Sequence, residues 1–238
     1  MQNQENALAV LREFLSLEHC SSAVLEKFAQ LPGAISRRLG DRMDYVYIPS
    51  TRPSPVLLVA HADVDVDLHQ TPILIEDAVK ISNTKDLLGA DDRAGCAIIW
   101  LLRNLGHGIL ITDGEEDGCL AIEALKVENQ QLVEELNSCY QFMVEFDRAG
   151  RQQFKCYDVG TDEFRQYVQK MTGFQEPDRK CGTDIRHLAQ KICGVNISCG
   201  YGNAHHFDEY IVKDDWLYDL QVAEKWLSAS ELPKFPLV

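Results

Sequence analysis

The chain has 238 residues, 45% of them hydrophobic and 25% charged, which is enough for one large domain or two small ones with a buried core. Its formal net charge of −14 argues against nucleic acid or an anionic membrane as the main partner. No apolar run approaches the roughly 20 residues of a membrane span. The polar first six residues lack the basic start and apolar centre of a signal peptide, so we expect a cytoplasmic protein.

Two helices and two strands are predicted in the first quarter of the chain. Apolar residues at helical spacing indicate the helices, and short apolar or alternating runs indicate the strands. In chain order they are a helix over 6–18, a helix from Ser21 or Ser22 to Pro32-Gly33, a strand over 44–48 at a sheet edge, and a fully buried strand over 56–60. The polar stretch 64–90 is predicted to be a loop with one short strand, at 73–75 or 79–81.

Strands and helices alternate through the rest of the chain. In order they are a helix over 94–105, a strand over 109–111, helical periodicity over 119–137, a strand over 142–146, helices over 162–171 and 183–192, a strand over 195–199, and a helix over about 215–228. This alternation predicts an α/β fold, a mostly parallel central sheet with helices on both faces, as a single domain over 1–238. Pro233 and Pro236 predict a loose tail, and the eight cysteines, none in a C-x-x-C pair, are expected to be free thiols.

Residues of the types that bind metals follow several predicted strands. They are His61 and Asp63 after 56–60, Glu115 and Glu116 after 109–111, Asp147 after 142–146, and His205 and His206 after 195–199. Asp91 lies shortly before the helix at 94–105. Because the carboxyl ends of parallel strands meet at one edge of a sheet, where ligands bind, these residues predict a convergent site. A carboxylate close to a histidine is also the usual partner of a metal-bound imidazole.

The chemistry of this residue set indicates the metal. Two imidazoles and three carboxylates, without cysteine, favour zinc, with manganese or cobalt as alternatives. Five ligands exceed one tetrahedral site with an open position, and they fit two ions that share a bridging carboxylate. Singly, each motif has a simpler explanation, since Asp91-Asp92 could cap a helix and Glu115-Glu116 could be a solvated pair of charges.

Together, the motifs resemble those of the co-catalytic zinc exopeptidases, the clan that holds peptidase T, the aminoacylases and the zinc aminopeptidases. The matching segments are Val59-Ala60-His61-Ala62-Asp63, Leu88-Gly89-Ala90-Asp91-Asp92-Arg93-Ala94-Gly95, Glu115-Glu116-Asp117-Gly118, Cys181-Gly182-Thr183-Asp184 and Asn203-Ala204-His205-His206-Phe207-Asp208-Glu209. Their order and coarse spacing are kept from residue 56 to about 210, and Arg93 replaces the lysine of the peptidase T motif.

The resemblance implies two zinc ions and a role for each residue. Asp91 would bridge the ions, His61 and Asp147 would complete one site, Glu116 and His205 the other, Glu115 would be the general base for a metal-bridging water, and Asp63 would orient His61. The pKa of the metal-bound water would fall toward about 7, and Glu115 would pass its proton to the leaving amine. His206 is the alternative to His205, which is preferred because Glu209 follows it by four residues, as in the family motif.

One departure from the family concerns its lid. Peptidase T and its nearest relatives carry a lid or dimerisation domain of about 100 residues after the position of Asp147. Here only 57 residues separate Asp147 from His205. The chain is therefore expected to be a bare catalytic domain. What replaces the lid, and whether the chain forms an oligomer, stay open.

The expected activity is exopeptidase cleavage of short peptides, with an N-acyl small molecule as the alternative substrate. Negative charge around the site favours a free α-amino group, and hence an aminopeptidase, although Arg93 and Arg148 oppose this preference. The acidic residues that would supply this charge are Asp63, Asp65, Asp67, Asp113 and Asp117. Two other functions are an amide deacylase or deacetylase for a non-peptide substrate, and a non-catalytic binding protein that keeps the fold.

Overall fold

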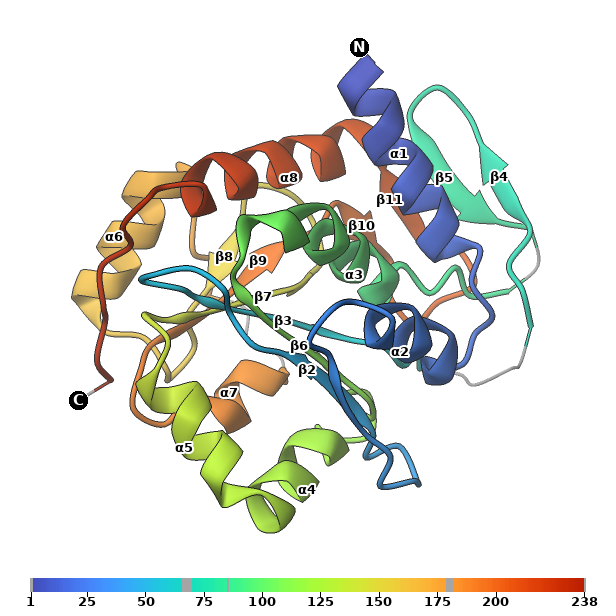
Figure 1. The fold of residues 1–238 in the computed structure, drawn as a ribbon. Coiled ribbons are helices and arrows are strands. Elements are labelled where there is room, and N and C mark those ends of the chain that lie inside the picture. The colour runs from blue at the N-terminus through green and yellow to red at the C-terminus, as the bar shows by residue number, and fades with distance from the viewer. Residues whose placement is uncertain (1, 66–69, 85, 179–181, 238) are drawn as a thin grey trace.

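A seven-stranded sheet forms the centre of the computed structural model, which describes residues 2–65, 70–84, 86–178 and 182–237 (Figure 1). In spatial order the strands are β1 (Ile35–Arg37), β2 (Tyr45–Ile48), β6 (Gly108–Thr112), β3 (Leu57–His61), β7 (Met143–Arg148), β9 (Gly194–Ser198) and β8 (Phe154–Lys155). The four central strands, β6, β3, β7 and β9, run parallel, and β1, β2 and β8 pair antiparallel with their neighbours. The predicted α/β fold around a largely parallel sheet is therefore confirmed.

The apolar run of β3 is buried on both of its sides. Leu58 and Ala60 belong to one apolar cluster, and Leu57 and Val59 belong to a second. Adjacent strand residues point to opposite faces, so a strand that is covered on both faces needs a continuous apolar run instead of an alternating one. The run ends at His61, a buried polar residue at the carboxyl end of β3.

Helices cover the sheet and supply many of the other residues of each cluster. The helices are α1 (Gln2–Leu15), α2 (Ser21–Ala29), α3 (Ala90–Leu102), α4 (Leu120–Glu128), α5 (Gln130–Ser138), α6 (Asp162–Thr172), α7 (Asp184–Leu188) and α8 (Lys213–Leu227), with a 3₁₀ turn at Arg103–Leu105. Residues of α1, α2, α3, α6 and α8 join the cluster of Leu58, and residues of α4, α5 and α7 join the cluster of Leu57. Figure 1 shows α3 and α8 on one side of the central strands and α4, α5 and α7 on the other. Within the described ranges, no helix has the length and apolar character needed to cross a membrane.

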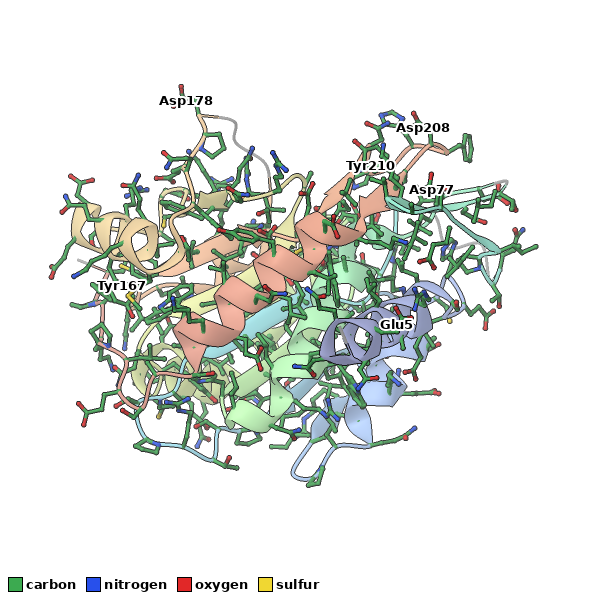
Figure 2. The ribbon with its side chains drawn as sticks, turned by 90° about the horizontal axis from the view of Figure 1, so that it is seen from above. Glu5, Asp77, Tyr167, Asp178, Asp208 and Tyr210 are labelled. Carbon is green, nitrogen blue, oxygen red and sulfur yellow. The ribbon has the colours of Figure 1, made fainter. Side chains whose placement is uncertain are left out.

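A second, antiparallel sheet is built from four short strands. In spatial order they are β10 (Tyr201–Gly202), β11 (Tyr210–Val212), β5 (Lys80–Asn83) and β4 (Leu74–Glu76). Both β4 and β5 form, where one strand was expected, because they pair with each other. β10 and β11 are too short to show a hydrophobic period, so the sequence did not indicate them. Figure 2 shows Asp208 and Tyr210 at the periphery of the molecule, near Asp77 of the adjacent β4–β5 hairpin.

The structure corrects the edge position predicted for β2 and the length predicted for the helix at 183–192, and it divides the helical periodicity over 119–137 between two helices. β2 is not an edge strand, because the short, exposed strand β1 occupies the edge. The periodicity over 119–137 belongs to two helices, since the Asn129 side chain accepts a hydrogen bond from Leu132 N at 3.1 Å and starts α5. The helix expected over 183–192 ends at Leu188.

The C-terminal tail is packed, not loose. Leu232 and Phe235 are buried, and the Phe235 N–H donates to the Gln141 carbonyl at 3.0 Å. The cysteines that the structure describes are free, as predicted, and Cys181 lies outside the described residues.

Candidate metal centre

Parallel strands bring the predicted site residues to one edge of the main sheet. β6, β3 and β7 are parallel neighbours, so their carboxyl ends lie side by side. The opening of α3 has non-helical backbone angles at Asp91 and Asp92, which are joined by a cis peptide bond. The site residues are thus distributed as follows: His61 ends β3, Asp91 lies at the start of α3, Glu115 and Glu116 follow β6, Asp147 lies near the end of β7, and His205 lies between β10 and β11.

His61 lies at the buried side of the cluster. Its Nε2 is 3.2 Å from Asp91 Oδ1 and 3.6 Å from Asp147 Oδ1. Its Nδ1 is 3.4 Å from Asp63 Oδ1, and the side chain is only 1% exposed. The structure therefore brings His61, Asp91 and Asp147 together, with Asp63 on the other edge of the imidazole.

His205 lies at the open side of the same cluster. Its Nε2 is 3.2 Å from Asp91 Oδ2 and 3.1 Å from Glu116 Oε1, and its side chain is 44% exposed. The two carboxylate oxygens of Asp91 thus face two different imidazoles. Among the described residues, the groups of neighbouring ligand-type side chains include His205 and not His206.

Asp63 contacts more of the site than the sequence indicated. Its Oδ1 accepts the Glu115 N–H at 3.2 Å, and its Oδ2 accepts the Glu116 N–H at 3.1 Å. The Arg42 guanidinium also donates to Oδ2 at 3.3 Å. Burial opposes ionisation, but His61, the Glu116 N–H and Arg42 together hold the pKa of Asp63 below its usual range. One ionised carboxylate therefore positions both His61 and the Glu115-Glu116 segment.

Asp147 is held by polar side chains that had no predicted metal-binding or catalytic role, although one of them, Thr183, lies in a family-like motif. Thr183 Oγ1 donates to Asp147 Oδ2 at 2.9 Å, and Tyr201 OH donates to Oδ1 at 3.3 Å. Asn196 exchanges hydrogen bonds of 2.9 Å with the Asp147 main chain in both directions. A polar Asn in the middle of an apolar strand was the signal that could have indicated this role, because a buried amide needs partners.

Thr183 and Asp184 are both fully buried, at 0% exposed. Glu145 accepts hydrogen bonds from the Thr183 hydroxyl and from the Asp184 N–H, the latter at 3.2 Å. Asp184 in turn accepts from the Thr112 hydroxyl at the end of β6. Thr183 and Asp184 therefore link β7 to the end of β6 through buried hydrogen bonds next to Asp147.

The acidic surroundings change the ionisation of the cluster. Burial, with the charges of nearby carboxylates, raises the pKa of Glu115 to about 9 and the pKa of Asp147 to about 7. Asp91 behaves in the opposite way, since its contacts with His205 and His61 outweigh burial and lower its pKa. The contacts of His205 with Asp91 and Glu116 raise the pKa of its imidazole to about 11. Positive charge is therefore what this cluster stabilises.

The residues present fit divalent cations. Nitrogen and oxygen atoms of three residue groups each lie within 4.8 Å of one another. Glu116 Oε1 is buried and receives no hydrogen bond from any described residue, although His205 Nε2 is near it. Imidazole with carboxylate is a suitable donor set for zinc. The groups are His61, Asp91 and Glu116; His61, Asp92 and Asp147; and Asp65, Glu116 and His205.

Of the acidic residues expected to crowd the site, Asp65 lies beside Glu116 and His205, and no described residue forms a hydrogen bond or ion pair with its carboxylate. Asp113 accepts a hydrogen bond from Ser21 Oγ at 3.0 Å, and Asp117 pairs with Arg42 at 2.6 Å. Asp63 is occupied as described above, and Asp67 lies outside the described residues. The two opposing arginines are engaged elsewhere: Arg93 donates to the carbonyls of Glu18 and Cys20, and Arg148 donates to Gln153.

Known proteins match this chain by structure only. No protein-family model and no curated protein sequence matches it. The aminopeptidase PepT from Bacillus cereus ATCC 10987 superimposes over 94% of this chain and 98% of its own, with a TM-score of 0.66 at 14% identity. A tripeptidase from Staphylococcus aureus subsp. aureus Mu50 covers the same shares, with a TM-score of 0.72 at 12% identity. The chain has the fold of these peptidases.

A third protein of similar structure forms large assemblies. The TET1 peptidase of Pyrococcus horikoshii, which can assemble into a tetrahedron or a large octahedral shell, covers 92% of this chain and 98% of its own, with a TM-score of 0.63 at 11% identity. At identities this low the likeness is one of fold. The function must therefore be argued from the cluster itself.

Proposed function

We propose that this chain is a two-metal amide hydrolase, and specifically an aminopeptidase for short peptides. The observation that carries the proposal is the position of Asp91. Its two oxygens face His61 and His205, with Asp147 beside the first imidazole and Glu116 beside the second. A carboxylate between two such ligand sets is what two neighbouring metal ions share.

The proposed ligand sets follow from these contacts. His61 and Asp147 would hold one ion, Glu116 and His205 would hold the other, and Asp91 would contact both. Zinc suits these donors best, with manganese or cobalt as alternatives. When bound, the two cations would supply Lewis acidity at the scissile carbonyl and at the attacking water.

Glu115 is the proposed general base. It lies next to Glu116, and its backbone is fixed by Asp63. With a pKa raised to about 9 its carboxyl is protonated at neutral pH, and nearby positive charge favours the ionised form that a base needs. Glu115 would then accept a proton from the attacking water and give it to the leaving amine. Asp63 would act indirectly, by orienting His61 and the Glu115 main chain.

The amino-terminal preference rests on Asp65. It is exposed beside Glu116 and His205, at the open side of the cluster. No described residue forms a hydrogen bond or ion pair with its carboxylate, so the carboxylate is available to the free α-ammonium group of a peptide. We also propose that residues 1–238 act as one catalytic domain without a lid, and that substrate enters past His205. We also propose that the chain self-associates, as the TET1 peptidase does, and light scattering would measure the mass of the assembly.

Metal content and substrate preference test this function together. The purified chain should retain about two zinc ions and should release the first residue of unblocked di- and tripeptides. Glu115→Gln should keep the metal and lower kcat by about 10²- to 10⁴-fold. Hydrolysis of N-acetylated substrates alone would instead identify a deacylase. Full folding without zinc binding would identify a non-catalytic protein.

A further inference from the structure

The loop that carries His205 has one buried anchor. Residues 203–208 are all exposed or half-buried, whereas Glu209 is 1% exposed. Two backbone hydrogen bonds, from His206 N to Asn203 O at 3.2 Å and from Glu209 N to His206 O at 2.9 Å, are internal to the loop. Figure 2 shows Asp208, next to the anchor, at the periphery of the molecule. The position of His205 therefore depends on what holds Glu209.

Glu209 is held by the segment that carries Asp91. Its Oε2 accepts the Gly89 N–H at 2.7 Å, and its Oε1 accepts the Asp91 N–H at 3.0 Å. Gly89 has a φ of 70° and directly precedes α3, so the left-handed turn into the helix presents its N–H to this carboxylate. A single side chain thus joins the His205 loop to the turn that positions Asp91.

These contacts join Glu209, Asp91 and His205 in a closed ring. The Glu209 carboxylate binds the Asp91 main chain, and the Asp91 side chain lies 3.2 Å from His205 Nε2, four residues before Glu209 in the same loop. An exposed loop without such an anchor would lose conformational freedom when its histidine binds a ligand, which weakens binding. With the anchor, that ordering is already present before binding.

We infer that Glu209 is a positioning residue that fixes the separation of His205 and Asp91 and so raises the affinity of the His205 side for a divalent cation. The inference rests on the proposed metal site. Glu209 itself touches neither substrate nor metal in this role. Both N–H groups that it binds would lose their partner with its removal, and buried N–H groups are rarely left unpaired.

Zinc titration of two matched variants tests this role. Glu209→Gln keeps the shape of the side chain, but places an amide donor against one of the two N–H groups. Asp219→Asn is the control, because Asp219 is also buried and accepts hydrogen bonds, from Ser198 Oγ at 2.8 Å and Gln152 N at 3.3 Å, but lies in α8 outside the cluster. For each full chain, after chelation and dialysis, the melting temperature is measured against zinc concentration. The absorption spectrum with Co²⁺ is recorded in parallel.

We expect Glu209→Gln to need about 10- to 100-fold more zinc for half of the maximal stabilisation and to have an altered Co²⁺ spectrum. Asp219→Asn should need as much zinc as the unmodified chain, even if its zinc-free melting temperature falls. An unchanged zinc requirement in Glu209→Gln, with only a lower zinc-free melting temperature, would show a purely structural role and overturn the inference. If Glu209→Gln does not fold, the same titration of Glu209→Asp decides. An unmodified chain that zinc does not stabilise would instead overturn the proposed metal site.

Discussion

The two imidazoles of the cluster are held in opposite ways. His61 ends a strand that pairs on both sides, and it is almost fully buried against Asp63. His205 lies in an exposed loop that Glu209 anchors. A strand-borne ligand is fixed by main-chain pairing and side-chain packing, whereas a loop-borne ligand depends on a few contacts. We therefore expect tighter metal binding on the His61 side, and substrate access on the His205 side.

The largest expected effect comes from the residue that the two sides share. Asp91→Asn should lose both ions and lower kcat/KM by about 10³-fold or more, because several kcal/mol of transition-state stabilisation depend on the metals. Metal analysis with peptide hydrolysis measures both effects. His205→Ala should lose one ion only, and Asp117→Asn, which alters an exposed carboxylate paired with Arg42, should lose none. Retention of both ions by Asp91→Asn would remove the basis for a shared carboxylate.

His107 is a buried histidine beside the amino end of β3, at the opposite end of the strand from His61. Its substitution tests whether the stability of the sheet and the binding of metal are independent. His107 Nδ1 accepts the Val56 N–H at 3.2 Å, and Nε2 donates to the Leu227 carbonyl at 2.9 Å. Burial, with the neighbouring Arg52 charge, lowers the pKa of His107 to about 4. The unfolded chain binds this proton near pH 6.5, so the contribution of His107 to stability is present above pH 6.5 and is lost as the pH falls toward 4.

His107→Gln removes that titration. Between pH 7 and pH 4 the unmodified chain should lose up to about 3 kcal/mol more unfolding free energy than the variant. Urea denaturation in chelator at several pH values measures the difference. Zinc affinity at pH 7 should be the same in both proteins. Parallel pH curves for the two proteins would show that His107 is not held neutral.

A smaller effect on stability should separate the two sides of the cluster. Thr183→Val removes the hydroxyl that donates to Glu145 and Asp147, and should lower the unfolding free energy by about 1–3 kcal/mol. His205→Ala alters a half-exposed loop residue and should change it by less than about 0.5 kcal/mol. Both are measured by urea denaturation in chelator. Equal losses would contradict the difference between a strand-supported side and a loop-supported side.

The smallest expected effect concerns substrate choice at the open side. Asp65→Asn should lower the preference for free over N-acetylated peptide termini by up to about 5-fold, the scale of one exposed ion pair. The effect should appear in KM, with kcat nearly unchanged, since an amine contact of this kind binds substrate and transition state alike. Asp117→Asn is the control for a loss of surface charge. If Asp65→Asn instead lowers the zinc content, Asp65 is a metal ligand and not a specificity residue.

The sequence by itself determined the α/β fold and the candidate ligands. A continuous apolar run such as 56–60 requires burial on both sides, and its polar end must emerge at the edge of the sheet. His61, Asp63, Glu115, Glu116 and Asp147 could therefore be selected from their positions after strands, since order along the chain and strand polarity are sufficient for that inference. Asp91 and His205 were also candidates by position, and the family-like motifs favoured His205 over His206 and gave Asp91 its expected role between two ions.

Only the tertiary structure decided which groups support the candidate ligands. Asn196, Thr183 and Tyr201 come from three separate segments, and their contacts with Asp147 depend on register and rotamers that no local pattern specifies. The same holds for Glu209, whose partners lie about 120 residues earlier in the chain. Hydrophobic periodicity determines which face of an element is buried, but hydrogen bonds between distant segments form only after those faces have packed.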